Sequence, residues 1–334
     1  FLAGHESFAA AEGAIVAAGA ASVKVGADFE SSMSQVAATM GMTTEEIRGG
    51  SKDFETLKNA AQQAGETTAF SATESAQALN YLALAGYDAG KAAEVLPSVL
   101  NLAAAGGMDL AYASDLVTDS MSALGIEATK SNVDEFGDKM AKTASKANTS
   151  VAQLGEATLT VGGTAKDLAG GVTELNTVLG ILADNGIKGS EGGTALRNMI
   201  LSLEAPTDKA AGQLEELGVQ VFDSTGKMRS MQDIMADLNK AMANMTSGER
   251  TQALNTIFNK VDLKSVNALL GTSTERWNEL AGAIDNSTGA MQAMADVQLD
   301  NLEGDVTLLQ SALEGLGIAV YDHLNEPLRD AVQT

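Results

Sequence analysis

The chain has 334 residues, of which 45% are hydrophobic and only 4% aromatic, so it can bury a sizeable core that consists mostly of small side chains. Its 44 acidic residues outnumber the 21 basic ones, and the net charge of −23 argues against a protein that grips nucleic-acid phosphates or anionic membrane surfaces. Cysteine is absent, which excludes disulfides, thiolate nucleophiles and cysteine-based metal sites.

Residues 1–27 are rich in Ala and Gly and are expected to form an N-terminal helix. Their most apolar stretch, residues 13–23, lies between Glu12 and Lys24 and is too short to cross a bilayer, so no transmembrane segment is predicted. No basic region precedes this stretch and the first residue is Phe, which argues against a signal peptide and favours a fragment of a longer protein.

Signals for helix starts and ends recur through the rest of the chain. In a capping box, a hydroxyl residue and a Glu three positions later satisfy each other's free backbone amides at a helix start. Such pairs occur at Thr43 and Glu46, Ser71 and Glu74, and Thr272 and Glu275, with Asn132 and Glu135 as a variant. Gly86, Gly186 and Gly271 follow apolar runs, where C-terminal caps belong. We expect several medium-length helices.

Between these signals the apolar residues recur at helical spacing. A methionine-rich stripe is formed by Met231, Ile234, Met235, Leu238, Met242 and Met245. Such stripes occur in peptide-binding grooves, but in a protein with few aromatic residues methionine is also the natural filler of core gaps. We favour the core interpretation.

One segment predicts strands. Residues 219–223 read as a strand, residues 224–226 as a turn, and residues 227–229 as a returning strand. A small β-hairpin inside an all-α chain is therefore expected.

Residues 272–334 are predicted to be a long helical segment. Apolar residues alternate three and four positions apart, which is typical of a coiled-coil seam: Leu299, Leu302, Val306, Leu309, Leu313, Leu316 and Val320. The flanking positions are mostly small or neutral: Glu303, Asp305, Gln310, Ala312, Gly317 and Ala319. Either the seam packs on the same domain, or Leu302, Val306, Leu309, Leu313 and Leu316 mediate self-association. The fold class is thus an all-α multi-helix bundle with one small β-hairpin and a long C-terminal helix.

No catalytic, cofactor or metal site is predicted. The two histidines, His5 and His323, lie at opposite ends of the chain, so neither a zinc site nor a Ser-His-Asp arrangement has its parts. Residues 86–91 resemble a phosphate-binding loop, but the glycine spacing is one residue short and Ala92 replaces the magnesium-binding hydroxyl. Trp277 is the single tryptophan of the sequence, and we expect it to pack in the core rather than to stack on a bound sugar.

Particular strings carry a family resemblance. Residues 70–86 read FSATESAQALNYLALAG, residues 182–190 read LADNGIKGS, residues 193–197 read GTALR, and Pro206-Thr207 follows. In order and spacing these strings resemble the phage tail tape measure family. The resemblance covers roughly residues 28–271, which we take as one helical domain, and extends more loosely into the seam. The family usually also has a long repetitive helical region, so the parent protein is expected to continue downstream.

The matched residues have a physical interpretation as packing residues that position helices. Gly186 and Gly189 bracket a short turn, and Ser190 is expected to cap the next helix, so residues 182–203 predict a helix-turn-helix corner. The full set assigned to packing is Phe70, Ser71, Glu74, Gly86, Leu182, Asp184, Asn185, Gly186, Gly189, Ser190, Arg197 and Pro206.

The resemblance implies a structural protein, not an enzyme, without a cofactor. It would lie in the lumen of the virion tail tube after assembly in the host cytoplasm, set tail length, and leave ahead of the genome. Implied partners are the tail tube protein, tail assembly chaperones, baseplate or tail-tip proteins, and further copies of itself on the tail axis. The acidity would keep it from sticking to DNA in the same channel. Two alternatives stay open: a membrane-active or pore-forming helical protein, suggested by residues 8–26, and a peptidoglycan hydrolase.

Overall fold

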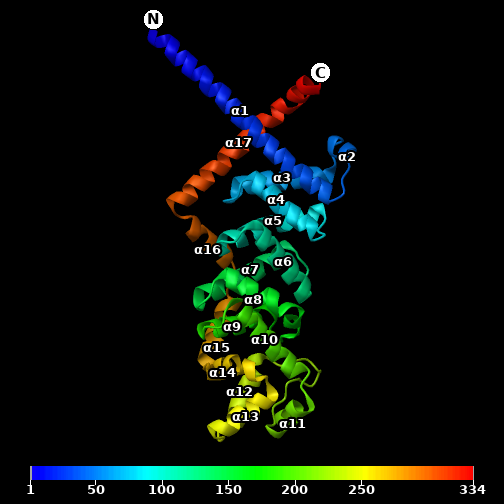
Figure 1. Cartoon of the computed structure of the whole chain (residues 1–334), viewed down its shortest axis with the longest axis vertical. Coiled ribbons are helices and arrows are strands. Elements are labelled where there is room, and N and C mark those ends of the chain that lie inside the picture. Colours follow the sequence, from blue (N-terminus) through cyan, green and yellow to red (C-terminus); the bar gives the residue numbers. More distant parts are fainter. Residues whose placement is uncertain (1, 334) are drawn as a thin grey trace. The chain divides into compact units, whose positions relative to one another are not determined.

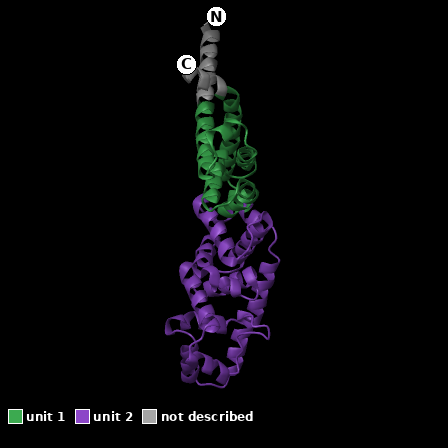
Figure 2. Ribbon diagram, turned by 90° about the vertical axis from the view of Figure 1, so that its right-hand side faces the viewer, with its two compact units in different colours: residues 1–104, 297–334 green, residues 105–296 purple. Residues whose placement is uncertain are grey.

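The computed structural model describes the backbone of residues 2–333 and the side chains of residues 21–325. The chain divides into two compact units (Figure 2). Unit 1 comprises residues 1–104 and 297–334, and unit 2 comprises residues 105–296. Unit 2 is continuous in sequence, whereas unit 1 is assembled from the two ends of the chain. The side chains of residues 1–20, on which the pore-forming alternative largely rests, lie outside the described residues.

Unit 1 is built around a pair of long helices. Its helices are α1 (Leu2–Thr39), α2 (Thr44–Arg48), α3 (Lys52–Thr67), α4 (Ala72–Leu84), most of α5 (Ala89–Gly106), and α17 (Leu302–Gln333). α1 crosses α17 and also packs on α4, while α3 packs on α4 and α17 (Figure 1). The crossing is close because Gly26 lacks a side chain: a Cβ atom there would lie 2.0 Å from Cγ of Tyr321.

Unit 2 is a stack of shorter helices. They are α6 (Leu110–Leu124), α7 (Lys130–Lys146), α8 (Val151–Val161), α9 (Gly171–Asp184), α10 (Gly189–Glu204), α11 (Asp208–Glu216), α12 (Met231–Ala241), α13 (Ser247–Ile257), α14 (Leu263–Gly271), α15 (Thr274–Asp285) and most of α16 (Ala290–Leu299). Two short 3-10 helices, η1 (Gly162–Asp167) and η2 (Lys260–Asp262), join them. Within the unit α8 packs on α10, and α15 packs on α7 and α9.

The predicted core is largely confirmed. Met231, Ile234, Met235, Leu238 and Met242 are buried, so the methionine stripe is core packing, with Met245 half-buried at its end. Trp277 is also buried, as expected for a packing residue. Residues 86–91 form the turn after α4 and the start of α5, and not a phosphate-binding loop.

Two of the predicted capping boxes are confirmed, at Thr43 with Glu46 and at Ser71 with Glu74. The box at Thr272 is wrong because its hydroxyl donates to the Ala268 carbonyl at the end of α14, and Ser273 caps α15 instead. The variant at Asn132 is wrong because α7 already begins at Lys130, with Thr129 as its cap. A box that the sequence reading missed joins Thr246 and Glu249.

The glycine caps are confirmed at two of three positions. Gly86 and Gly186 follow their helices with positive φ angles of 86° and 76°, a backbone conformation that favours glycine. Gly271 is instead the last residue of α14, and its φ is not positive.

The predicted β-hairpin is wrong. Between residues 2 and 333 the structure contains no sheet, and residues 219–229 make a single antiparallel bridge between Phe222 and Met228. The Asp223 side chain accepts hydrogen bonds from the Thr225 hydroxyl and from the backbone amides of Lys227 and Thr225, and these bonds lower the pKa of Asp223. Ser230 then caps α12, which begins at Met231, so too few residues remain for a strand ladder.

The long C-terminal helix is confirmed as α17, whereas the coiled-coil seam stays a prediction, and Leu299 lies outside this helix. That residue ends α16, and the helix is interrupted before α17 begins at Leu302. No helix in the described part of the chain is both long and apolar enough to cross a membrane.

Candidate functional site

The corner between α9 and α10 contains the string LADNGIKGS and carries a network of polar contacts. The end of α9 is closed by hydrogen bonds from Ile187 N to the Leu182 carbonyl at 2.9 Å and from Asn185 Nδ2 to the Ile181 carbonyl at 2.9 Å. The positive φ of Gly186 lets the chain reverse between these two bonds. The predicted helix-turn-helix corner is confirmed.

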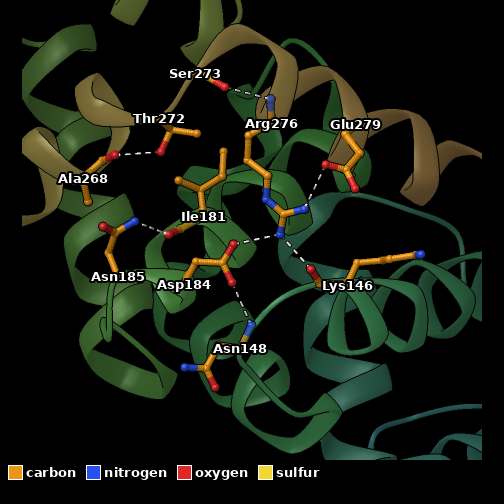
Figure 3. A network of polar contacts seen from close by, with 10 residues as sticks. All are labelled: Lys146, Asn148, Ile181, Asp184, Asn185, Ala268, Thr272, Ser273, Arg276 and Glu279. Atoms are coloured by element: carbon orange, nitrogen blue, oxygen red, sulfur yellow. Dashed lines mark hydrogen bonds and ion pairs between the residues drawn. The ribbon is translucent and has the colours of Figure 1, made fainter.

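Asp184, the last residue of α9, joins three segments of unit 2 (Figure 3). Its Oδ1 accepts a hydrogen bond from Asn148 N at 2.8 Å, in the loop between α7 and α8. Its Oδ2 pairs with Arg276 Nη2 at 2.8 Å, in the first turn of α15. Arg276 also donates to the Lys146 carbonyl at 2.7 Å and lies 3.5 Å from Glu279. We call Asp184, Arg276, Asn148 and Lys146 the corner clamp.

The electrostatics of the corner clamp favour the charged pair. The hydrogen bond to Asp184 raises the pKa of Arg276, with a smaller opposing effect of burial. Lys188 adds a hydrogen bond from its Nζ to Asn148 Oδ1 at 2.8 Å. The clamp thus adds charge-assisted bonds between the two turns and α15 to the apolar packing of the buried Trp277 and Leu280 of α15.

Glycines next to the clamp let α10 approach α8. A Cβ atom on Gly193 would lie 2.3 Å from the Ala157 carbonyl oxygen and 2.7 Å from Thr160 Cβ. Gly189 has a positive φ of 54°, and a Cβ there would lie 2.5 Å from Glu156 Oε2. Gly193 is therefore explained by the close approach of two helices, and Gly189 by its positive φ.

Ser190 does not cap α10, so that expectation is wrong. The helix already begins at Gly189, its N-cap residue Lys188 makes no side-chain capping bond, and Ser190 is exposed in the first turn. Leu182 is fully buried, whereas Arg197 is half-buried with Nη1 3.5 Å from the Thr160 carbonyl. Pro206 is half-buried just before Thr207, which caps α11.

The remaining matched residues lie in unit 1. Ser71 Oγ accepts from Glu74 N at 3.2 Å, and Glu74 Oε2 accepts from Ser71 N at 2.8 Å. The same helix start is bound by α17, because Thr73 N donates to Glu314 Oε1 at 2.9 Å. Phe70 is half-buried and Gly86 is exposed. The matched residues thus form two separate groups of helix termini, one in each unit.

Two buried carboxylates were missed from the sequence. Asp138 on α7 accepts hydrogen bonds from Gly289 N and Met291 N, both at 2.8 Å, and so holds the start of α16. Glu174 on α9 accepts from Gly170 N at 2.7 Å and from Met231 N at the start of α12. Burial raises the pKa of Glu174. The sequence signal that could have identified Asp138 and Glu174 is an acidic residue on an otherwise apolar helix face.

Asp138 and Glu174 have a structural role. Each carboxylate binds backbone amides at or next to a helix start, where the helix dipole favours negative charge. Across the described side chains no group of three or more His, Asp or Glu residues is arranged to hold a metal ion.

The residues assigned to self-association form a second surface, on α17. Leu302, Val306, Leu309, Leu313 and Leu316 are all exposed. The opposite side of α17, which includes Ser311, Ile318 and Tyr321, is buried in unit 1.

Comparison with known proteins gives one consistent result. The family described as phage-related minor tail protein matches residues 58–259. The chain is 34% identical to the tape measure protein of Pneumococcus phage Dp-1, over 94% of the chain and 26% of that protein. It is 31% identical to the probable tape measure protein of Escherichia phage P2, over 100% of the chain and 41% of that protein. It is 23% identical to the probable tape measure protein of Clostridium phage phiCD119, over 93% of the chain and 33% of that protein.

The chain therefore spans well under half of the length of these relatives. No solved structure matches it. The relatives favour neither a pore-forming protein nor a peptidoglycan hydrolase. The matched family region covers more than half of the chain, and the tape measure protein of phage Dp-1 and two probable tape measure proteins align with nearly all of it. The chain therefore belongs to the phage tail tape measure family.

Proposed function

We propose that this chain is a folded part of a tape measure protein, a structural component that sets tail length and has no enzymatic role. The observation that carries the proposal is the alignment of tape measure proteins from two phages, at 34% and 31% identity, over 94% and 100% of the chain. The site chemistry supports it, because the polar groups of the corner clamp bind other parts of the same chain.

The protein would lie in the lumen of the virion tail tube, after assembly in the host cytoplasm. The tail tube protein, tail assembly chaperones and baseplate or tail-tip proteins are its proposed partners, together with further copies of itself on the tail axis. The net charge of −23 suits a channel that DNA later occupies, since like charges repel.

The geometry distinguishes a folded segment from an extended ruler. A continuous helix advances about 1.5 Å per residue, so deleting part of a true ruler shortens the tail in proportion. In this chain the helices fold back on one another through the corner clamp, and deleting one of them exposes core to water. Deletions within residues 70–258 should therefore prevent tail assembly rather than shorten tails.

The experiment compares two series of in-frame deletions of equal length in the particle that carries this protein. One series removes helices within residues 70–258, and the other removes multiples of the repeat from a long repetitive helical region of the full-length protein. Electron micrographs of the particles should show missing tails in the first series and proportionally shorter tails in the second. Intact tails shortened in proportion in the first series would contradict the proposal of a folded segment.

A further inference from the structure

A cleft of about 520 Å³ lies in unit 1, where α1, the start of α4 and α17 meet. Each of the three helices contributes one carboxylate to its lining: Asp28, Glu74 and Glu314. Among the described residues that line this cleft there is no Lys, Arg or His, and none of the three carboxylates forms an ion pair with a described side chain. The cleft therefore concentrates negative charge without a balancing cation. We call it the acidic cleft.

Contacts within unit 1 use only part of the hydrogen-bonding capacity of these carboxylates. Glu314 accepts from Thr73 N through Oε1 at 2.9 Å, and Glu74 accepts from Ser71 N through Oε2 at 2.8 Å. The second oxygen of each carboxylate, and both oxygens of Asp28, make no hydrogen bond to the residues that the structure describes. The two bonds thus hold Glu314 and Glu74 in place and leave acceptors for a ligand.

A buried hydroxyl in the acidic cleft points independently to a ligand. Ser311 on α17 lines the cleft and is only 5% exposed, yet its hydroxyl has no hydrogen-bond partner in the described part of the chain. Thr307, one turn earlier, donates instead to the Glu303 carbonyl at 2.8 Å, which is a common way for a helix to satisfy such a group. A buried polar group without a partner is costly, so a partner is expected in the cleft.

The lining groups favour an ammonium ion over a metal ion. Across the described side chains no group of three or more acidic residues or histidines is arranged to hold a metal ion. A primary ammonium group carries three N–H donors on one small head, which suits acceptors that come from different helices. A guanidinium is planar and binds best to a single carboxylate from one side. Val25 gives the cleft an apolar wall against which an alkyl chain can pack.

We propose that the acidic cleft binds a primary ammonium group carried on an alkyl chain, supplied by a lysine side chain of a partner or by a free diamine. The ammonium group would donate to Asp28, Glu314 and Ser311. Because these residues belong to α1 and α17, the bound group would connect the two ends of the chain that together form unit 1. Binding to the folded state alone stabilises it, so the ligand should also raise the melting temperature.

The first experiment titrates the purified chain by isothermal calorimetry with cadaverine, as a free diamine, and with Nα-acetyl-lysine amide, as a lysine side chain. The salt concentration is about 0.15 M, where the Debye length of about 8 Å weakens general attraction to an acidic protein. At least one of the two probes should bind saturably at one site, and the probe that binds more tightly identifies the source of the ammonium group. The same amide acetylated on Nε should not bind, because it carries no charge.

The second experiment locates the site with variants that keep the size of each side chain. Asp28→Asn combined with Glu314→Gln should weaken binding about tenfold or more, because two charge-assisted hydrogen bonds are lost. The glutamine oxygen can still accept from Thr73 N, so the helical circular dichroism spectrum should be kept. The matched control is Glu66→Gln with Asp119→Asn, which removes two exposed carboxylates outside the cleft and should bind like the wild type.

Ser311→Ala tests the built site without any change in charge. It should weaken binding as well, since the hydroxyl is one of the proposed acceptors. Three outcomes would overturn the proposal. One is the lack of saturable binding by either probe, and another is an equal loss of affinity in the cleft variant and its matched control, which would reduce the effect to net charge. The third is binding of Mg²⁺, and of neither probe, that the cleft variant abolishes.

Discussion

Gly193 offers a sharp test of the packing between α8 and α10. Replacement by Ala adds one methyl group at a point where a Cβ would lie 2.3 Å from a backbone carbonyl oxygen, that of Ala157. A backbone atom inside a helix cannot rotate away as the end of a long side chain can. The two helices must therefore separate, and the contacts on both sides of the glycine weaken.

The expected size follows from two opposing effects. Overpacking of this kind costs about 1–3 kcal/mol of unfolding free energy. Ala stabilises a helix interior relative to Gly by about 0.8–1 kcal/mol, which offsets part of that cost. Gly193→Ala should then destabilise unit 2 by up to about 2 kcal/mol. For a unit of this size, that corresponds to a melting temperature lowered by up to about 8 °C.

The assay is thermal unfolding followed by circular dichroism at 222 nm, with Gly282→Ala as the matched control. Gly282 also lies within a helix of unit 2, but nothing lies within 4 Å of a Cβ placed there. The control should melt at the wild-type temperature or slightly above it, because only the helix-propensity effect applies. If Gly193→Ala melts no lower than Gly282→Ala, the close approach of α8 and α10 is not the reason for glycine at this position.

Two further predictions concern the carboxylates of unit 2. Asp184→Asn and Arg276→Met should show a coupling energy of about 0.5–1 kcal/mol in a double-mutant cycle of urea unfolding. The value is modest because the two side chains are 31% and 28% exposed. If the two losses of unfolding free energy simply add, the ion pair contributes nothing to stability. Glu174 has a raised folded-state pKa, so its contribution to stability is present below the unfolded pKa and is lost as the pH rises through the folded value. Glu174→Gln should therefore be less destabilising at pH 7 than at pH 4, and an equal effect at both pH values would contradict the assigned pKa direction.

The helical class of the fold followed from local signals that act over a few residues. Capping boxes at Thr43 and Ser71 and the glycine ends at Gly86 and Gly186 were predictable because each is completed within its own turn. The methionine stripe was assigned to the core from its spacing alone. The hairpin prediction was wrong for a local reason too, since the Asp223 side chain binds the Lys227 amide that a strand ladder would use.

The corner clamp could be predicted only in part. The string that contains Asp184 was recognised, but its partner Arg276 lies 92 residues further along the chain, and no local pattern marks such a pairing. The same holds for Glu314 and Thr73, which are 241 residues apart. The spacing of apolar residues and the capping residues indicate where a helix begins, ends and buries a face. The contacts of Arg276 and Glu314 depend instead on which helices pack together in three dimensions.

The division of the chain has a consequence for folding during synthesis. Unit 2 is one uninterrupted segment, so it can complete its core as soon as residues 105–296 have left the ribosome. Unit 1 cannot complete its core at that stage, because α1 packs on α17, which is synthesised last. Glu314, Tyr321 and Asp322 of α17 are synthesised more than 200 residues after the α1, α3 and α4 residues that they contact. The first helices of the nascent chain therefore have apolar faces without their final cover throughout this interval, and a ribosome-associated chaperone that shields residues 21–104 would raise the yield of folded protein.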